Sequence, residues 1–99
     1  MDYQELRDAA GDISYGCIEG FNLTGENVRK AFHAIQKYMV EETRLGIPVF
    51  TVTESLHGSV HDGSTIFPQS VAVGSTFNLD LAYQMTKAIA TELRSQGVI

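Results

Sequence analysis

The sequence predicts an α/β fold of the kind that begins a (β/α)8 barrel. Three observations support this prediction: an amphipathic helix precedes a short apolar strand, a polar loop follows the strand, and a second amphipathic helix follows the loop. A complete barrel needs about 250 residues, whereas this sequence has 99. We therefore expect an N-terminal fragment of a (β/α)8 TIM-like barrel, in the order helix, strand, long loop, helix and start of a second strand.

Residues 1–43 form the expected leading segment and helix of this single partial domain. Residues 2–10 predict a short helix that ends at Gly11. In residues 12–20, apolar side chains are interrupted by glycines, which predicts a loop with some extended character.

The next helix is expected to begin with Thr24 as its N-cap. Apolar residues then recur at steps of three and four and form one face: Val28, Ala31, Phe32, Ile35, Tyr38 and Met39. Arg44 suits the last turn of this helix, and Gly46 suits the position just after it.

Residues 44–99 are expected to supply the first strand, a substrate loop and the following helix. The run Ile-Pro-Val-Phe-Thr-Val-Thr at 47–53 is β-branched and aromatic without polar alternation, which predicts a parallel strand buried on both faces. Glu54 follows the strand directly, and residues 55–66 are rich in glycine, serine and threonine, as in a loop.

The last part of the chain predicts a short helical turn over 68–73, closed by Gly74, and then a long helix with Asn78 as N-cap. The apolar face of the long helix comprises Leu81, Met85, Ala88, Ile89 and Leu93. Two apolar residues at 98–99 predict the start of a second strand.

The composition excludes several classes of function. The net charge is −5 with no basic stripe, so we expect no nucleic-acid partner. No apolar run approaches the roughly 20 residues of a membrane span, so we expect no membrane partner. Cys17 is the only cysteine, which excludes an internal disulfide and a cysteine-based zinc site. The first residues show no signal segment, and the periplasm, the extracellular space and the cytoplasm all remain open.

Five short motifs stand out in the second half of the chain: RLGIP at 44–48, ESLHG at 54–58, TIFPQ at 65–69, GSTFN at 74–78 and TELRSQG at 91–97. Together they resemble the first strand, first loop and following helix of the glycoside hydrolase family 3 catalytic barrel. The motifs occur in the family's order over residues 38–99.

The resemblance implies retaining hydrolysis of a terminal, non-reducing β-linked sugar, with an oligosaccharide or an aryl or alkyl glycoside as substrate and no cofactor. In the family, the nucleophile and the acid/base residue come from later parts of the barrel, beyond residue 99. The resemblance therefore assigns no catalytic residue to this chain. Because the remainder of the barrel is needed, residues 1–99 alone are expected to be inactive.

Glu54 is the candidate substrate-binding residue. A carboxylate at a strand end is often simply solvated, but the resembled family has an acidic residue here that accepts hydrogen bonds from sugar hydroxyls. In the family, glutamate in place of aspartate is associated with pentosides such as xylosides. The resemblance thus favours a β-xylosidase. The alternatives are a β-glucosidase of the same family, or a non-catalytic truncated fragment or interaction module that buries its exposed sheet edge against a partner.

His57 and Gly58 are expected to be structural residues of the loop, the first tying the loop to nearby backbone and the second allowing a turn. His57 and His61 are four residues apart and, with Glu54, could suggest a metal site. That spacing joins ligands on a helix, whereas glycines make this segment a loop, so we expect no metal. The Ser, His and Asp within 59–62 are interpreted as loop polarity rather than as a catalytic triad.

Overall fold

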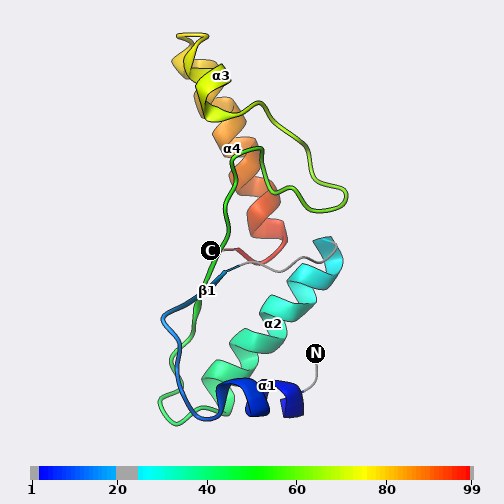
Figure 1. Ribbon diagram of the computed structural model, residues 1–99, viewed down its shortest axis with the longest axis vertical. Helices are drawn as coiled ribbons and strands as arrows, with labels where there is room; N and C mark the ends of the chain where they lie inside the picture. The colour runs from blue at the N-terminus through cyan, green and yellow to red at the C-terminus, as the bar shows by residue number, and fades with distance from the viewer. Residues whose placement is uncertain (1–2, 20–24, 99) are drawn as a thin grey trace.

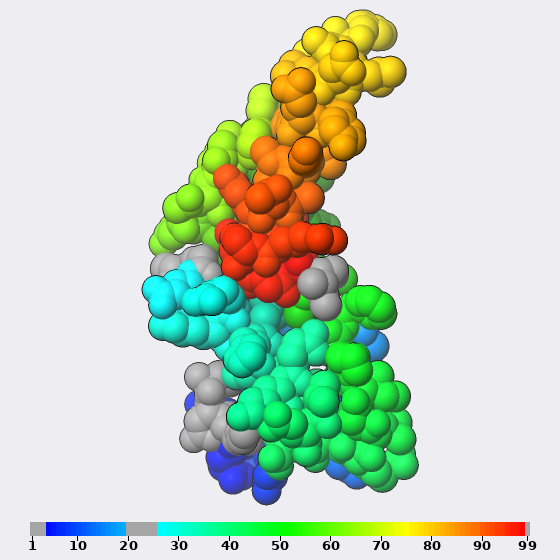
Figure 2. Space-filling view, turned by 180° about the vertical axis from the view of Figure 1, so that it is seen from behind, coloured from blue at the N-terminus to red at the C-terminus, as the bar shows by residue number. Residues whose placement is uncertain are grey.

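A computed structural model describes residues 3–19 and 25–98 (Figure 1). The elements, in order, are α1 (Tyr3–Ala10), β1 (Cys17–Glu19), α2 (Gly25–Glu41), β2 (Phe50–Val52), α3 (Ser70–Gly74) and α4 (Leu79–Ser95). The fold is therefore a mixture of helices and strands, as predicted. The molecule measures 49 × 24 × 17 Å, and it is elongated because α3 and the start of α4 project beyond the remaining elements (Figures 1 and 2).

The two strands are parallel neighbours, and α2 is the connection between them. Cys17 lies opposite Phe50, and Glu19 lies opposite Val52. The expected extended character within residues 12–20 is thus a short strand, and α2 follows this strand instead of preceding the first one. Sequence pattern missed the strand because a three-residue run beside Gly16 has too little periodicity, and only pairing with β2 defines it.

The core lies between α1, α2 and the start of β2. Its buried residues are Leu6, Ala10, Ile35, Tyr38, Met39 and Val49. The Tyr38 hydroxyl is satisfied in this apolar setting because it donates to the Gly11 carbonyl oxygen at 2.7 Å.

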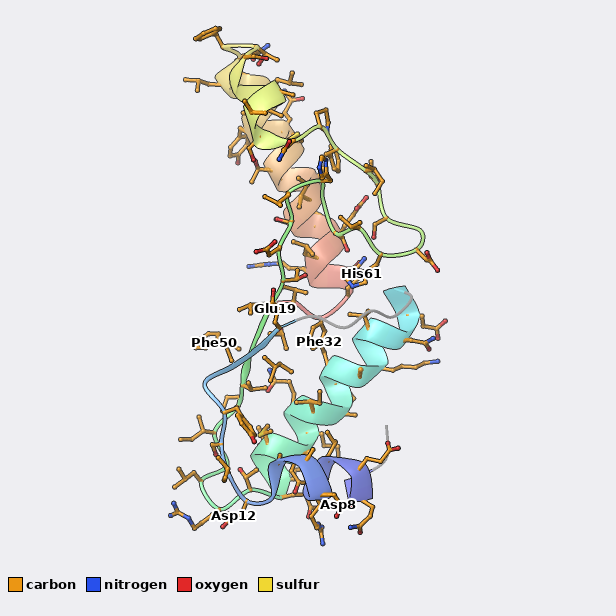
Figure 3. All side chains as sticks on the ribbon, in the orientation of Figure 1. Asp8, Asp12, Glu19, Phe32, Phe50 and His61 are labelled. Carbon is orange, nitrogen blue, oxygen red and sulfur yellow. The ribbon has the colours of Figure 1, made fainter. Side chains whose placement is uncertain are left out.

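The prediction that the strand at 47–53 is buried on both faces is wrong for this structure. Thr51 is fully buried, but Phe50 is 66% exposed and Val52 is 40% exposed. Figure 3 shows Phe50 pointing away from α2. The reason is that α2 covers one face of the two strands, and none of the described helices covers Phe50 on the other.

Helix α2 ends at Glu41, earlier than Arg44 and Gly46 indicated. The Thr43 hydroxyl donates to the Met39 carbonyl oxygen at 2.5 Å and so satisfies a helix-end carbonyl from outside the helix. Arg44 and Gly46 therefore lie in the turn after the helix. The proposed N-cap, Thr24, lies outside the described residues.

Strand β2 begins at Phe50 and not at Ile47, because the residues before it bond elsewhere. Pro48 has no N–H to give to a neighbouring strand. The Val49 N–H donates to Gln36 Oε1 at 3.1 Å, and the Val49 carbonyl oxygen accepts from Gln36 Nε2. The Gln36 amide on α2 therefore takes the place of a strand neighbour for Val49.

The beginning of α4 is as predicted, since Asn78 Oδ1 accepts from the Leu81 N–H at 3.0 Å. Helix α3 starts at Ser70, two residues after Pro68. Of the predicted apolar face of α4, Ile89 is buried whereas Leu81 is 48% exposed.

The end of α4 forms a Schellman motif. The Val98 N–H donates to the Leu93 carbonyl oxygen, and the Gly97 N–H donates to the Arg94 carbonyl oxygen, both at 3.1 Å. Gly97 has φ of 93°, as the motif requires. Val98 therefore takes part in the helix end, and the start of a second strand at 98–99 stays a prediction because Ile99 lies outside the described residues.

Candidate functional site: Glu54 and its loop

Glu54 lies just past the carboxyl end of β2, which finishes at Val52. Its side chain is exposed. Among residues 3–19 and 25–98, its carboxylate accepts no hydrogen bond from another side chain or backbone group. Since ligands of parallel α/β folds bind at the carboxyl ends of strands, Glu54 has the position and the free acceptor atoms of a ligand-binding residue.

The loop that follows, residues 55–67, is closed at its base by His57. The His57 Nδ1 atom lies 3.1 Å from the Phe67 carbonyl oxygen, and the Phe67 N–H donates to the His57 carbonyl oxygen at 2.9 Å. Because a carbonyl oxygen only accepts, Nδ1 must carry a hydrogen. Nδ1 of His57 is therefore occupied by a hydrogen bond that joins the two ends of the loop.

Gly58 stands at a turn where a larger residue would not fit. Its N–H donates to the Ser55 carbonyl oxygen at 3.2 Å, and its φ is 90°. A Cβ atom at this position would lie 2.7 Å from the Thr65 carbonyl oxygen and 3.0 Å from Phe67 Cδ2. The two sides of the loop approach closely because residue 58 has no side chain.

Ser59 is a buried anchor of the loop. It is 3% exposed, donates to Gln96 Oε1 at 2.5 Å, and lies 2.7 Å from His61 Nδ1. Ser59 is thus a buried polar residue of the loop, whereas Asp62 is exposed.

The last turns of α4 hold the far side of the loop. Gln96 Nε2 donates to Ser64 Oγ at 2.8 Å. The Glu92 carboxylate accepts from the Thr65 N–H at 3.0 Å and from the Thr65 hydroxyl at 2.6 Å. Figure 3 shows His61 on this loop beside the C-terminal end of α4.

Sequence reasoning did not identify Gln96 or Glu92 as residues that shape the site. Both lie in the matching motif at 91–97, but a glutamine and a glutamate near a helix end are usually solvated, and their partners are far away in sequence. Only the return of the loop onto α4 reveals the role of these side chains.

A polar pocket of about 270 Å³ lies where the tip of the loop meets the first turn of α2 and the last turns of α4. Its lining includes Asp62, Ser64, Gln96 and Glu26, but not Glu54. The Lys30 ammonium, which is 2.8 Å from the Glu26 carboxylate, lowers the pKa of Glu26 below its ordinary value of 4.5 by hydrogen bonding and by its charge.

No three His, Cys, Asp or Glu side chains of residues 3–19 and 25–98 gather as a metal site would require. The helices in that part of the chain are all too short or too polar to cross a bilayer. Cys17 is exposed and forms no disulfide in the part of the chain that the structure describes.

Comparison with known proteins gives the family. Residues 5–99 match the model of the glycosyl hydrolase family 3 N terminal domain. A protein of Formosa agariphila, provisionally named a beta-xylosidase, is 36% identical over 86 residues, which are 82% of this chain and 11% of that protein. A second protein of this organism, named a beta-xylosidase, is 38% identical over 60 residues, which are 56% of this chain and 8% of that protein.

The chain spans about a tenth of the length of these curated relatives. No solved structure matches it significantly. Because the match to the N-terminal domain model extends over residues 5–99, the chain belongs to glycosyl hydrolase family 3.

Proposed function

We propose that this chain forms the first part of the (β/α)8 barrel of an exo-acting, retaining β-glycosidase that prefers β-xylosides. Residues 1–43 supply the leading segment with β1 and α2, and residues 44–99 supply β2, the substrate loop and the helix after it. The observation that carries the proposal is Glu54 at the carboxyl end of β2 in a family 3 chain whose relatives bear beta-xylosidase names.

Glu54 acts in this proposal as a sugar-binding residue and transfers no proton. An ionised carboxylate is purely an acceptor, and its two oxygens can receive charge-assisted hydrogen bonds from two neighbouring sugar hydroxyls. The nucleophile and the acid/base carboxylate of a retaining mechanism lie about 5 to 5.5 Å apart on opposite sides of the scissile bond. Those two groups come from the rest of the enzyme.

The length of the Glu54 side chain supports a preference for pentosides. Glutamate reaches one methylene further than aspartate, into the space where a hexose carries its hydroxymethyl group. A clash with that group, or a displaced hydrogen bond, discriminates between sugars more strongly than unfilled apolar space does.

The test compares nitrophenyl β-xyloside with nitrophenyl β-glucoside, using the product of the complete reading frame that encodes this chain. We expect kcat/KM to favour the xyloside by roughly tenfold or more. The matched variant is Glu54→Asp, which keeps the charge but shortens the reach and should shift the preference towards the glucoside.

Each alternative gives a different result in this experiment. A glucoside preference in the unmodified enzyme would replace the xylosidase by a β-glucosidase. Turnover of neither substrate would reject the enzymatic proposal and leave a non-catalytic chain.

A further inference from the structure

We infer that Gln96 is a positioning residue for Glu54, because the end of α4 binds the chain on both sides of that glutamate. The inference rests on the proposed sugar-binding role of Glu54. It adds a specificity-determining residue that touches no substrate and acts through the conformation of the loop.

Two adjacent residues at the end of α4 hold the two ends of the segment that carries Glu54. The Gly97 carbonyl oxygen accepts from the Thr51 hydroxyl at 2.7 Å, and Gln96 Oε1 accepts from the Ser59 hydroxyl at 2.5 Å. Thr51 precedes Glu54 and Ser59 follows it. Both ends of the segment 51–59 are therefore hydrogen-bonded to neighbouring residues at the end of α4.

These anchors are buried, so they cannot easily be replaced by water. Thr51 is 0% exposed, Ser59 is 3% exposed and Gln96 is 7% exposed. Glu54, by contrast, lies between these anchors in sequence and is exposed. The arrangement places an exposed carboxylate on a segment whose two ends are held by hydrogen bonds from buried hydroxyl groups.

The end of α4 is itself fixed against the rest of the fold. A Cβ atom on Gly97 would lie 3.4 Å from Phe32 Cβ, and Phe32 is 2% exposed on α2. Figure 3 shows Phe32 between α2 and the turn that follows α4. Gln96 therefore connects the loop to a helix end that packs beside a buried residue of α2.

Gln96 also uses both ends of its side-chain amide. While Oε1 accepts from Ser59, Nε2 donates to Ser64 at 2.8 Å. One side chain thus holds the loop just after Glu54 and again on its returning half. Replacing it with leucine, which is similar in size, removes both hydrogen bonds and leaves two serine hydroxyls without this partner.

The experiment compares Gln96→Leu with Gln84→Leu in the product of the complete reading frame. Gln84 is exposed on the same helix, so its substitution controls for the loss of a glutamine from α4. We expect Gln96→Leu to lower the ratio of kcat/KM for nitrophenyl xyloside over nitrophenyl glucoside by roughly tenfold, the value of one lost interaction of this kind. The control should leave the ratio unchanged.

The ratio separates positioning from general damage, because a partly unfolded enzyme loses activity on both substrates equally. A second arm repeats Gln96→Leu in a Glu54→Ala background, where it should change the ratio by less than about twofold, since residues that act through one another are non-additive. An unchanged ratio in folded Gln96→Leu, or an equal loss in both backgrounds, would overturn the inference.

Hydrogen exchange gives a readout that does not depend on activity. Amides of residues 55–67 should exchange faster in Gln96→Leu than in Gln84→Leu, while those of α2 stay protected. If the unmodified protein hydrolyses neither glycoside, the proposed function fails. Separately, equal exchange of the loop amides in Gln96→Leu and Gln84→Leu would disprove the anchoring of the loop by Gln96. If Gln96→Leu does not fold, Ser59→Ala removes the same hydrogen bond and takes its place, with the same outcomes expected.

Discussion

Gly58→Ala should open the loop beside Glu54, and its effect divides into two parts. The first is the backbone: an alanine held at φ of 90° costs about 1 to 2 kcal/mol. The second is contact: the new Cβ would lie 2.7 Å from the Thr65 carbonyl oxygen and 3.0 Å from Phe67 Cδ2, and overpacking of this kind costs about 1 to 3 kcal/mol.

Gly63→Ala is the matched control for the backbone part. Gly63 has φ of 84°, but a Cβ there would meet nothing within 4 Å. The difference between the two variants therefore isolates the contact part, about 1 to 3 kcal/mol in favour of Gly63→Ala.

The assay is native-state hydrogen exchange of the Phe67 amide, which donates to the His57 carbonyl oxygen. A difference of 1 to 3 kcal/mol makes exchange about 5- to 150-fold faster in Gly58→Ala than in Gly63→Ala. Equal exchange rates in the two variants would refute the conclusion that close approach of the loop requires glycine at residue 58.

Two further predictions concern α2. Gln36→Leu leaves both the N–H and the carbonyl oxygen of Val49 without their partner, so the free energy that protects the Phe50 amide should fall by about 2 kcal/mol; unchanged exchange of that amide would contradict this. Lys30→Ala should raise the pKa of Glu26 back towards 4.5, as measured by NMR titration. Because the pKa of Glu26 is lowered in the folded protein, the stabilisation by this pair is present at neutral pH and is lost as the pH falls through that pKa. A pKa that does not rise in the variant would exclude Lys30 as the cause.

Sequence periodicity predicted the long helices well because their signals are local. The apolar steps of α2 and the cap at Asn78 depend on residues three or four positions apart, and both are present in the structure. The ends were less accurate because they depend on individual hydrogen bonds. Helix α2 ends at Glu41, and the Gln36 amide binds Val49 just before β2.

The residues around Glu54 were predictable only in part. The family motif identified Glu54, His57 and Gly58, and the structure places all three where β2 leads into the loop. Gln96 could not be recognised, because a neutral amide near a helix end looks the same in sequence whether it faces solvent or binds a loop 37 positions away. Burial of Phe50 was overestimated, since an apolar strand pattern does not say how many of its faces are covered.

The parallel pairing of β1 and β2 has a consequence for the order of folding. Two parallel strands joined through a helix have no tight turn from which their pairing can start. Cys17 can therefore pair with Phe50 only after the chain between them has become compact. We expect the formation of α2, which lies between the two strands in sequence, to bring about that compaction. Substitutions on the buried face of α2 should therefore slow refolding. Substitutions where α3 contacts α4, two elements that are neighbours in sequence, should mainly accelerate unfolding.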